Sequence, residues 1–226
     1  MTTQEEMNKF RTTARVVGAV YLAGFVVGIV GNIMIQSILG PSNHLATISA
    51  SGMKVAIGAI LWLLAVVGDA GHGVLMFPVL KQHSERMAIG YLAARIVDAI
   101  FIAVMVLFML IQLPLGSEYL KAAASDASFL QALSALGVSG LMLCYTLYKA
   151  KLVPAWLAIW GLVGYATILF GMVSAIIGSG LGDLSSIPGG LWEVFIGVWL
   201  IAKGFSSSAF VSQPARTSNL TEPLVP

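Results

Sequence analysis

Four ionisable side chains interrupt two long apolar stretches of this sequence, and their types could support proton or cation chemistry. Asp69 and His72 lie in the segment VVGDAGHG, and Arg95 and Asp98 lie in ARIVD. The members of each pair are three residues apart, so a helix would place them on one face. Because ionisable groups are costly to bury in a membrane, such residues often mark a binding site or a pathway.

The composition indicates that membrane helices hold these residues. Of the 226 residues, 58% are hydrophobic and 10% are charged, and the mean hydropathy is +0.91. A typical globular domain in water carries roughly 25% charged residues, so this chain has too few to coat a globule. Helices satisfy their own backbone hydrogen bonds in lipid. We therefore predict an all-α fold, a polytopic membrane helix bundle.

Six apolar runs are long enough to cross a hydrocarbon layer about 30 Å thick. Pro154 and Pro188 stand at the first turns of the last two runs, where a missing N–H costs little. The predicted transmembrane domain, residues 14–205, lies between a cytoplasmic N-terminal segment, 1–13, and a disordered cytoplasmic tail, 206–226. Its six transmembrane helices are predicted at residues 14–39, 54–80, 88–113, 129–149, 153–178 and 188–205.

Lysine and arginine residues are distributed unevenly between the two sides of the predicted bundle. With the N-terminus in the cytoplasm, nine fall on the cytoplasmic side and two, Lys54 and Lys121, on the other, while Arg95 lies within a span. Positive residues concentrate in cytoplasmic loops, so both termini are predicted to be cytoplasmic. The formal net charge of +2, without a basic cluster, gives no indication of nucleic-acid binding.

The depth of the four ionisable residues follows from the short connection between their two helices. That connection, QHSER, is centred near position 83.5, so Asp69 and Asp98 lie 14.5 residues from it and His72 and Arg95 lie 11.5. In an antiparallel hairpin, equal distances from the turn mean equal depth. The two levels differ by about 4.5 Å, so all four side chains are predicted to form one cluster.

Two interpretations of this cluster remain open. In the first, Asp69 and Asp98 form buried salt bridges with Arg95 that fix the register of the helices. In the second, the cluster is a functional site, in which protonation of His72 would change its charge from −1 (two carboxylates, one guanidinium) to zero and create a proton-linked or cation-linked switch. No metal is expected, because Arg95 repels a cation, and neither a cofactor nor a catalytic residue is assigned.

A second group of polar residues lies in the outer parts of the first and sixth runs. Asn32, Gln36 and Glu193 could meet at similar depth and line an outer vestibule, or Glu193 beside Trp192 could reach toward lipid headgroups. The single cysteine, Cys144, lies in an apolar run, which excludes an intrachain disulfide and predicts a small buried side chain.

Glycines recur at helical spacing in several runs. Gly68, Gly71 and Gly73 flank the first ionisable pair and are predicted to let another helix or a ligand approach closely. Gly24 and Gly28 form a GxxxG motif, which is typical of close packing between membrane helices. Such glycine-rich faces could also bind a second copy of the chain or another membrane protein.

Three stretches of the sequence are similar to a known family. The segments RMAIGYLAARIVDAIF, LVPAWLAIWGLVGYATIL and IPGGLWEVFIGVWLIAKGF resemble the bacterial multi-pass membrane family called domain of unknown function 4386. The likeness covers nearly the whole chain, and its most specific parts are the Arg–acid pair and the ending LWE…G.WL..KGF. Asp98 stands where the family more often has Glu, which keeps the charge. The resemblance implies a bacterial cytoplasmic (inner) membrane protein of about six helices and no particular activity.

These observations predict an integral protein of the bacterial inner membrane with the lipid bilayer around it. We expect transport or sensing of a small solute or ion, with proton linkage as one form, through the cluster of Asp69, His72, Arg95 and Asp98. The alternative is a non-catalytic accessory or structural subunit that binds partner helices in a membrane complex. An enzyme is not expected.

Overall fold

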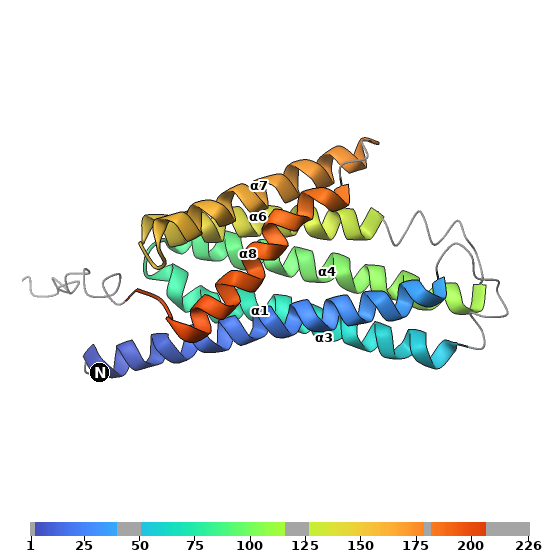
Figure 1. Ribbon diagram of the computed structural model, residues 1–226, viewed down its shortest axis with the longest axis horizontal. Helices are drawn as coiled ribbons and strands as arrows, with labels where there is room; N and C mark the ends of the chain where they lie inside the picture. Colours follow the sequence, from blue (N-terminus) through green and yellow to red (C-terminus); the bar gives the residue numbers. More distant parts are fainter. Residues whose placement is uncertain (1–2, 40–50, 116–126, 179–181, 207–226) are drawn as a thin grey trace, which may run out of the picture.

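The computed structural model describes residues 3–39, 51–115, 127–178 and 182–206. Within these residues the chain forms six α-helices and no strand, and each helix contains a stretch long and apolar enough to cross a membrane. The helices are α1 (Thr3–Leu39), α3 (Gly52–Lys81), α4 (Glu85–Leu115), α6 (Ala127–Lys149), α7 (Ala155–Ile176) and α8 (Gly182–Ala202) (Figure 1). The predicted all-α bundle of six membrane helices is confirmed.

The six helices form a closed ring. α3 packs against α1 and α4, α6 packs against α4 and α7, and α8 packs against α7 and α1. α8 crosses the bundle obliquely to reach α1, and its last turn lies at the same end of the bundle as the first turn of α1 (Figure 1). This arrangement encloses a central space whose lining comes from several helices at once.

α1 and α8 both extend beyond their predicted limits. α1 begins at Thr3, so the helix includes most of the polar segment that precedes the span. α8 begins at Gly182, and Pro188 lies inside it rather than in its first turn. The missing proline N–H leaves a carbonyl group without its helical partner, a defect that membrane helices tolerate where another helix packs against them. Here Gly189 packs directly against Gly164 of α7. The tail predicted to be disordered lies, apart from residue 206, outside the described residues.

A three-residue turn joins α3 to α4 and fixes how their polar residues meet. The backbone N–H groups of His83 and Ser84 donate to the Leu80 carbonyl at 3.0 and 2.9 Å. Lys81 and Glu85, the residues on either side of the turn, form an exposed ion pair at 3.1 Å. The two helices are therefore antiparallel neighbours with their register set at the turn, as the short QHSER connection predicted.

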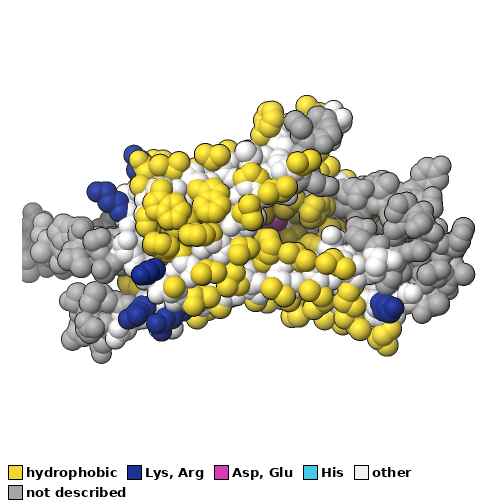
Figure 2. All heavy atoms as spheres, viewed as in Figure 1, with side chains coloured by type: hydrophobic (Ala, Val, Ile, Leu, Met, Phe, Trp, Pro, Cys, Tyr) yellow, Lys and Arg dark blue, Asp and Glu magenta, His cyan; other side chains and the backbone are white. Residues whose placement is uncertain are grey.

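Two groups of buried apolar side chains fill the ring at different depths. The larger group includes Val79, Leu80 and Leu147, near the α3–α4 turn, and the smaller group includes Ile35 and Ile102 at the other end. The outer faces of the helices carry many exposed aliphatic and aromatic side chains, which suit contact with lipid. Figure 2 shows this apolar belt, with Lys and Arg side chains gathered chiefly at the end that holds the start of α1.

Candidate functional site

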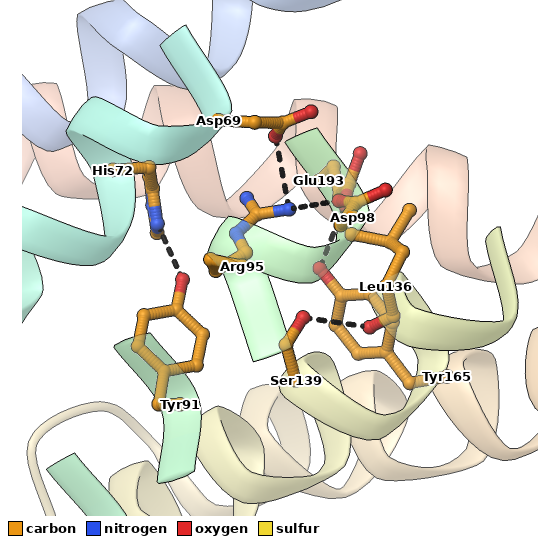
Figure 3. A network of polar contacts seen from close by, with 9 residues as sticks. All are labelled: Asp69, His72, Tyr91, Arg95, Asp98, Leu136, Ser139, Tyr165 and Glu193. Atoms are coloured by element: carbon orange, nitrogen blue, oxygen red, sulfur yellow. Dashed lines mark hydrogen bonds and ion pairs between the residues drawn. The ribbon is translucent and has the colours of Figure 1, made fainter. Parts of the chain in front are cut away.

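Arg95 lies at the centre of the bundle and binds two carboxylates. Its Nη1 atom is 3.0 Å from Asp69 Oδ1 across the α3–α4 interface and 3.4 Å from Asp98 Oδ2 on its own helix (Figure 3). The side chains of Arg95 and Asp98 are 3% and 1% exposed, whereas that of Asp69 is 25% exposed. Because a charge buried without a partner is strongly destabilising, these ion pairs explain how three charged groups coexist inside the bundle.

His72 shares a helix face with Asp69, but its ring contacts tyrosines rather than carboxylates. Its Nδ1 forms a hydrogen bond with the hydroxyl of Tyr91 on α4 (Figure 3). The ring also meets Tyr21 of α1, with ring centroids 4.1 Å apart and an interplanar angle of 63°. His72 is thus bound by one tyrosine hydroxyl and packed against a second phenol ring.

The register of α3 against α4 agrees with the prediction to within about one turn. Asp69 meets Arg95 and His72 meets Tyr91, whereas equal distances from the turn predicted Asp98 and Arg95 as their respective partners. The difference arises because the long side chains of Arg95 and Tyr91 reach past the level of their own backbone. The length of the turn therefore determines which parts of α3 and α4 lie side by side, and the length of the side chains determines which residues bond to one another.

Replacing Tyr91 with phenylalanine is expected to lower the free energy of unfolding by about 1–2 kcal/mol. The change removes the hydroxyl and leaves His72 Nδ1 buried without this hydrogen bond. Steric trapping of the protein in bicelles measures the free energy. Tyr148→Phe is the matched control, because Tyr148 is 42% exposed and its variant should stay within about 0.5 kcal/mol of the wild type. Equal effects of the two substitutions would contradict a structural role for the His72–Tyr91 hydrogen bond.

Glu193 faces the same central space, from α8. The Tyr165 hydroxyl, on α7, donates a hydrogen bond to Glu193 Oε1 at 2.7 Å (Figure 3). The neighbouring Trp192 is fully buried, and its Nε1 donates to the Leu157 carbonyl at 2.7 Å. Among the described residues Glu193 makes no ion pair at salt-bridge distance, so it adds a third carboxyl group that Arg95 does not bind directly.

The structure separates Glu193 from Asn32, one of its two predicted companions in an outer vestibule. Asn32 is exposed and does not line the central space, and the side chain of Gln36 lies outside the described residues. The alternative, in which Glu193 reaches toward headgroups, is also wrong, because the carboxyl group is bound to Tyr165 inside the ring. Glu193 lies inside the ring because the face of α8 that carries Trp192 and Glu193 is turned toward α7 and the interior.

A cavity of about 490 Å³ lies within the ring and joins these groups into one site. Most of its lining is apolar, and it includes residues from α1, α3, α4, α6, α7 and α8. Its ionisable lining residues are Asp69, His72, Arg95, Asp98 and Glu193, and its aromatic ones are Tyr21, Phe25, Trp62 and Phe129. A concave, mostly apolar space with a few convergent polar groups is the usual form of a small-molecule site.

Five polar atoms on residues that line the cavity lack hydrogen-bond partners within the described part of the chain. They are the Tyr21 hydroxyl, the indole Nε1 of Trp62, the Nε2 of His72, the Nε of Arg95 and the Oδ1 of Asp98, and all five are buried. A buried polar atom without a partner costs roughly 1–3 kcal/mol. The cavity therefore offers two unused N–H donors, one unused carboxylate acceptor, and a hydroxyl and an imidazole nitrogen that can each donate or accept, and a bound molecule could satisfy these groups.

The glycines around the site have two different roles. Gly73 allows close packing, because a Cβ there would lie 3.1 Å from Leu92 and 3.2 Å from Arg95. A Cβ at Gly71 or Gly24 would meet nothing within 4 Å, and one at Gly28 would only touch the Trp62 ring at 4.0 Å. The prediction that the GxxxG motif serves close helix packing is therefore wrong: Gly24 and Gly28 border the cavity and leave it open.

The described residues contain no group of three or more His, Cys, Asp or Glu side chains that could hold a metal ion. Cys144 is buried away from the cavity, where a Cβ at Gly161 would collide with its sulfur. What the site offers chemically is charge and hydrogen bonding: one guanidinium, three carboxyl groups, an imidazole and several aromatic rings. This set of groups suits recognition of a bound molecule.

The sequence contained signals for two of the residues that the prediction of the cluster omitted. Tyr91 precedes Arg95 by four residues, so it lies on the same face of α4. Tyr21 stands near the middle of an apolar span, where a polar hydroxyl needs an interior position. No local signal connected Glu193 or Tyr165 to the cluster, since they come from helices that join it only when the ring closes.

A ring of six apolar helices around a buried ionic cluster defines a polytopic α-helical membrane protein. The model of the family called domain of unknown function (DUF4386) matches residues 16–204, so the chain belongs to this family, as the sequence resemblance predicted. Comparison with curated proteins and with solved structures found no match. The family description names no activity, so only the site indicates a function.

Proposed function

We propose that the protein binds a small solute in its central cavity, as the first step in transporting or sensing that solute at the cytoplasmic membrane of a bacterium. The observation that carries the proposal is the cavity of about 490 Å³, which Asp69, Arg95, Asp98 and Glu193 line together. The Lys- and Arg-rich end of the bundle faces the cytoplasm in this proposal, as the distribution of positive charge favours.

The cavity favours a binding role over a purely structural one. Two carboxylates holding Arg95 would suffice to fix the register of α3 and α4, and protein interiors around such a pair are normally close-packed. Here the ion pairs border empty space, and Asp98 Oδ1 and His72 Nε2 have no partner among the described residues. Glu193, on a third helix, has no part in that register.

The accessory-subunit and enzyme hypotheses have less support. The glycines that permit the closest contacts pack against helices of the same chain, as Gly18 does against Gly197 and Gly137 against Leu169. These glycines therefore pack against other helices of the ring and do not form a surface for a partner protein. The thiol of Cys144 lies outside the cavity lining, which leaves that side chain without a nucleophilic role at the site.

Thiol labelling tests whether small solutes reach the cavity. In a Cys144→Ala background, Gly68→Cys places a thiol on the cavity lining, where its Cβ would make only an ordinary contact with Val20 at 3.8 Å. 2-Aminoethyl methanethiosulfonate, which crosses membranes as the neutral amine, is the probe. We expect modification of this cysteine, measured by intact-protein mass spectrometry, to be at least about tenfold faster than that of the control variant, a free-energy difference of roughly 1.4 kcal/mol in the barrier.

Gly71→Cys in the same background is the matched control. Gly71 lies in the same helix and also has open space around it, but it does not line the cavity. A thiol facing lipid stays protonated and reacts slowly, because the thiolate is the nucleophile. Equal rates at the two positions, or no modification at Gly68→Cys, would contradict solute binding in the cavity.

A further inference from the structure

The cavity opens sideways, between α1 and α8, within the depth of the membrane spans. Ile29, Ile187 and Leu191 line the cavity and are also 47%, 53% and 59% exposed on the outer surface. These residues lie within the spans Asn8–Ile35 and Leu184–Ala202. Figure 2 looks onto this opening: a hollow between apolar side chains shows acidic side-chain atoms at its base. In a bilayer, the opening faces lipid chains.

Glycines keep the opening wide where α1 and α8 diverge. The two helices touch at Gly18 and Gly197, where a Cβ on Gly18 would lie 2.5 Å from the Gly197 carbonyl oxygen. Farther along, a Cβ on Gly24 would meet nothing within 4 Å, and one on Gly190 would meet only Phe25 at 3.6 Å. The helices therefore form a V whose open side gives access to the cavity.

The charges at the base of the cavity favour a cation. Three carboxyl groups, on Asp69, Asp98 and Glu193, line the space with the single guanidinium of Arg95. Arg95 is already bound by two of these carboxylates through Nη1, so an anionic group could reach only its remaining N–H groups and would be repelled by three carboxyl groups. A second positive charge would instead meet Glu193 and the unpaired Oδ1 of Asp98.

Aromatic rings beside the acidic residues also favour a cationic group. Arg95 already lies over Tyr21 and Tyr91, with its guanidinium carbon 6.0 and 5.9 Å from the ring centroids. Trp62 and Phe25 also line the cavity, and neither has such a partner among the described residues. Indole and phenyl faces attract ammonium groups, most strongly when the site is dry.

We infer that the ligand is a cationic amphiphile, which enters from the lipid between α1 and α8 with its ammonium group directed at Glu193 and Asp98. This inference rests on the proposed binding function and adds the ligand class and the route. The apolar tail lies along Gly24, Gly28 and Leu191 and extends into the bilayer. The requirement for a positive head distinguishes this site from a general lipid-binding groove.

Saturable binding of radiolabelled dodecyltrimethylammonium to the full-length protein in phosphatidylcholine nanodiscs tests the inference, with empty nanodiscs as the blank. Dodecanol and dodecanoate, the neutral and anionic amphiphiles of equal chain length, serve as competitors. We expect unlabelled dodecyltrimethylammonium to displace the probe and both others to need at least about tenfold higher concentration. Glu193→Gln, which keeps an oxygen acceptor for Tyr165, should weaken binding at least about tenfold, equivalent to roughly 1.4 kcal/mol.

A matched pair of glycine variants tests the route. Gly24→Leu fills the opening without colliding with a neighbour, and Gly71→Leu adds the same side chain at an equally open position outside the cavity. We expect Gly24→Leu to weaken binding at least about tenfold, roughly 1.4 kcal/mol, and Gly71→Leu to leave it unchanged, with both variants monodisperse. Equal effects of the two would overturn entry between α1 and α8.

The outcomes separate this inference from the proposed function. If dodecanol competes as well as the cation and Glu193→Gln binds normally, the cationic class is wrong, while solute binding in the cavity stands. If no amphiphile binds saturably but Gly68→Cys is still modified faster than Gly71→Cys, the amphiphile and its route are both wrong and the cavity accepts another solute. If Gly68→Cys is not modified preferentially, the proposed function itself fails.

Discussion

Replacing Arg95 with leucine is expected to lower the free energy of unfolding by about 3–5 kcal/mol, because it leaves carboxylates of Asp69 and Asp98 in the bundle without their cation. The loss is a large part of the stability of a domain, which is typically about 5–15 kcal/mol. Steric trapping in bicelles measures the difference, and the fraction of protein inserted in membranes provides a second readout.

The triple variant Asp69→Asn, Arg95→Leu, Asp98→Asn should recover most of that stability, because removing all members of a buried ionic group is often neutral. Lys81→Ala is the surface control: the Lys81–Glu85 pair is exposed, and its loss should cost at most about 1 kcal/mol. If the triple variant were as unstable as Arg95→Leu, uncompensated charge would not be the cause. The triple variant should still lose probe binding, which distinguishes the structural from the binding role of the cluster.

Replacing Gly18 with valine is expected to lower the free energy of unfolding by about 3 kcal/mol, the upper part of the range for overpacking. A Cβ at Gly18 would lie 2.5 Å from the Gly197 carbonyl oxygen and 3.2 Å from the Ile201 backbone nitrogen, so α8 has to move away as a whole. α8 carries Glu193, and its displacement should also lower the affinity of the cavity for dodecyltrimethylammonium. Steric trapping and the nanodisc binding assay measure the two effects.

Gly24→Val is the control in the same helix. It introduces the same β-branched side chain and the same small change in helix propensity, but its Cβ meets no atom within 4 Å. Its free energy of unfolding should therefore stay within about 1 kcal/mol of that of the wild type. If both variants were equally destabilised, the introduction of a valine into α1, rather than the contact between α1 and α8, would explain the loss.

The predicted spans were close to the observed helices because each depends on local composition. A run of apolar residues has to cross the hydrocarbon layer, and a helix is the form that satisfies its backbone there. The departures lie at the ends: α8 starts before Pro188 because the backbone beside the proline is covered by α7, a contact that the sequence does not reveal. In the same way, α1 begins at Thr3, in a polar segment with no apolar period to mark it.

The contact between the two halves of the ionic cluster was also predictable. A short turn makes α3 and α4 antiparallel neighbours, so the distances of Asp69 and Arg95 from that turn place both at nearly the same depth. The sequence did not predict which side chains bond to one another, because the rotamer of a long side chain can shift a contact by one helical turn. His72 therefore meets Tyr91 rather than Arg95, which lies at an equal distance from the turn.

Six membrane helices and the cluster of Asp69, Arg95 and Asp98 follow from the sequence, because helix length and turn length act locally. The position of Glu193 in this cluster and of Gly24 at an opening follows from the packing of distant helices. Both depend on the angle at which α8 crosses α1, which results from contacts such as Gly18 with Gly197 between residues far apart in the chain. The pattern of apolar residues along a single helix does not predict the angle between two helices. That angle leaves room for the cavity.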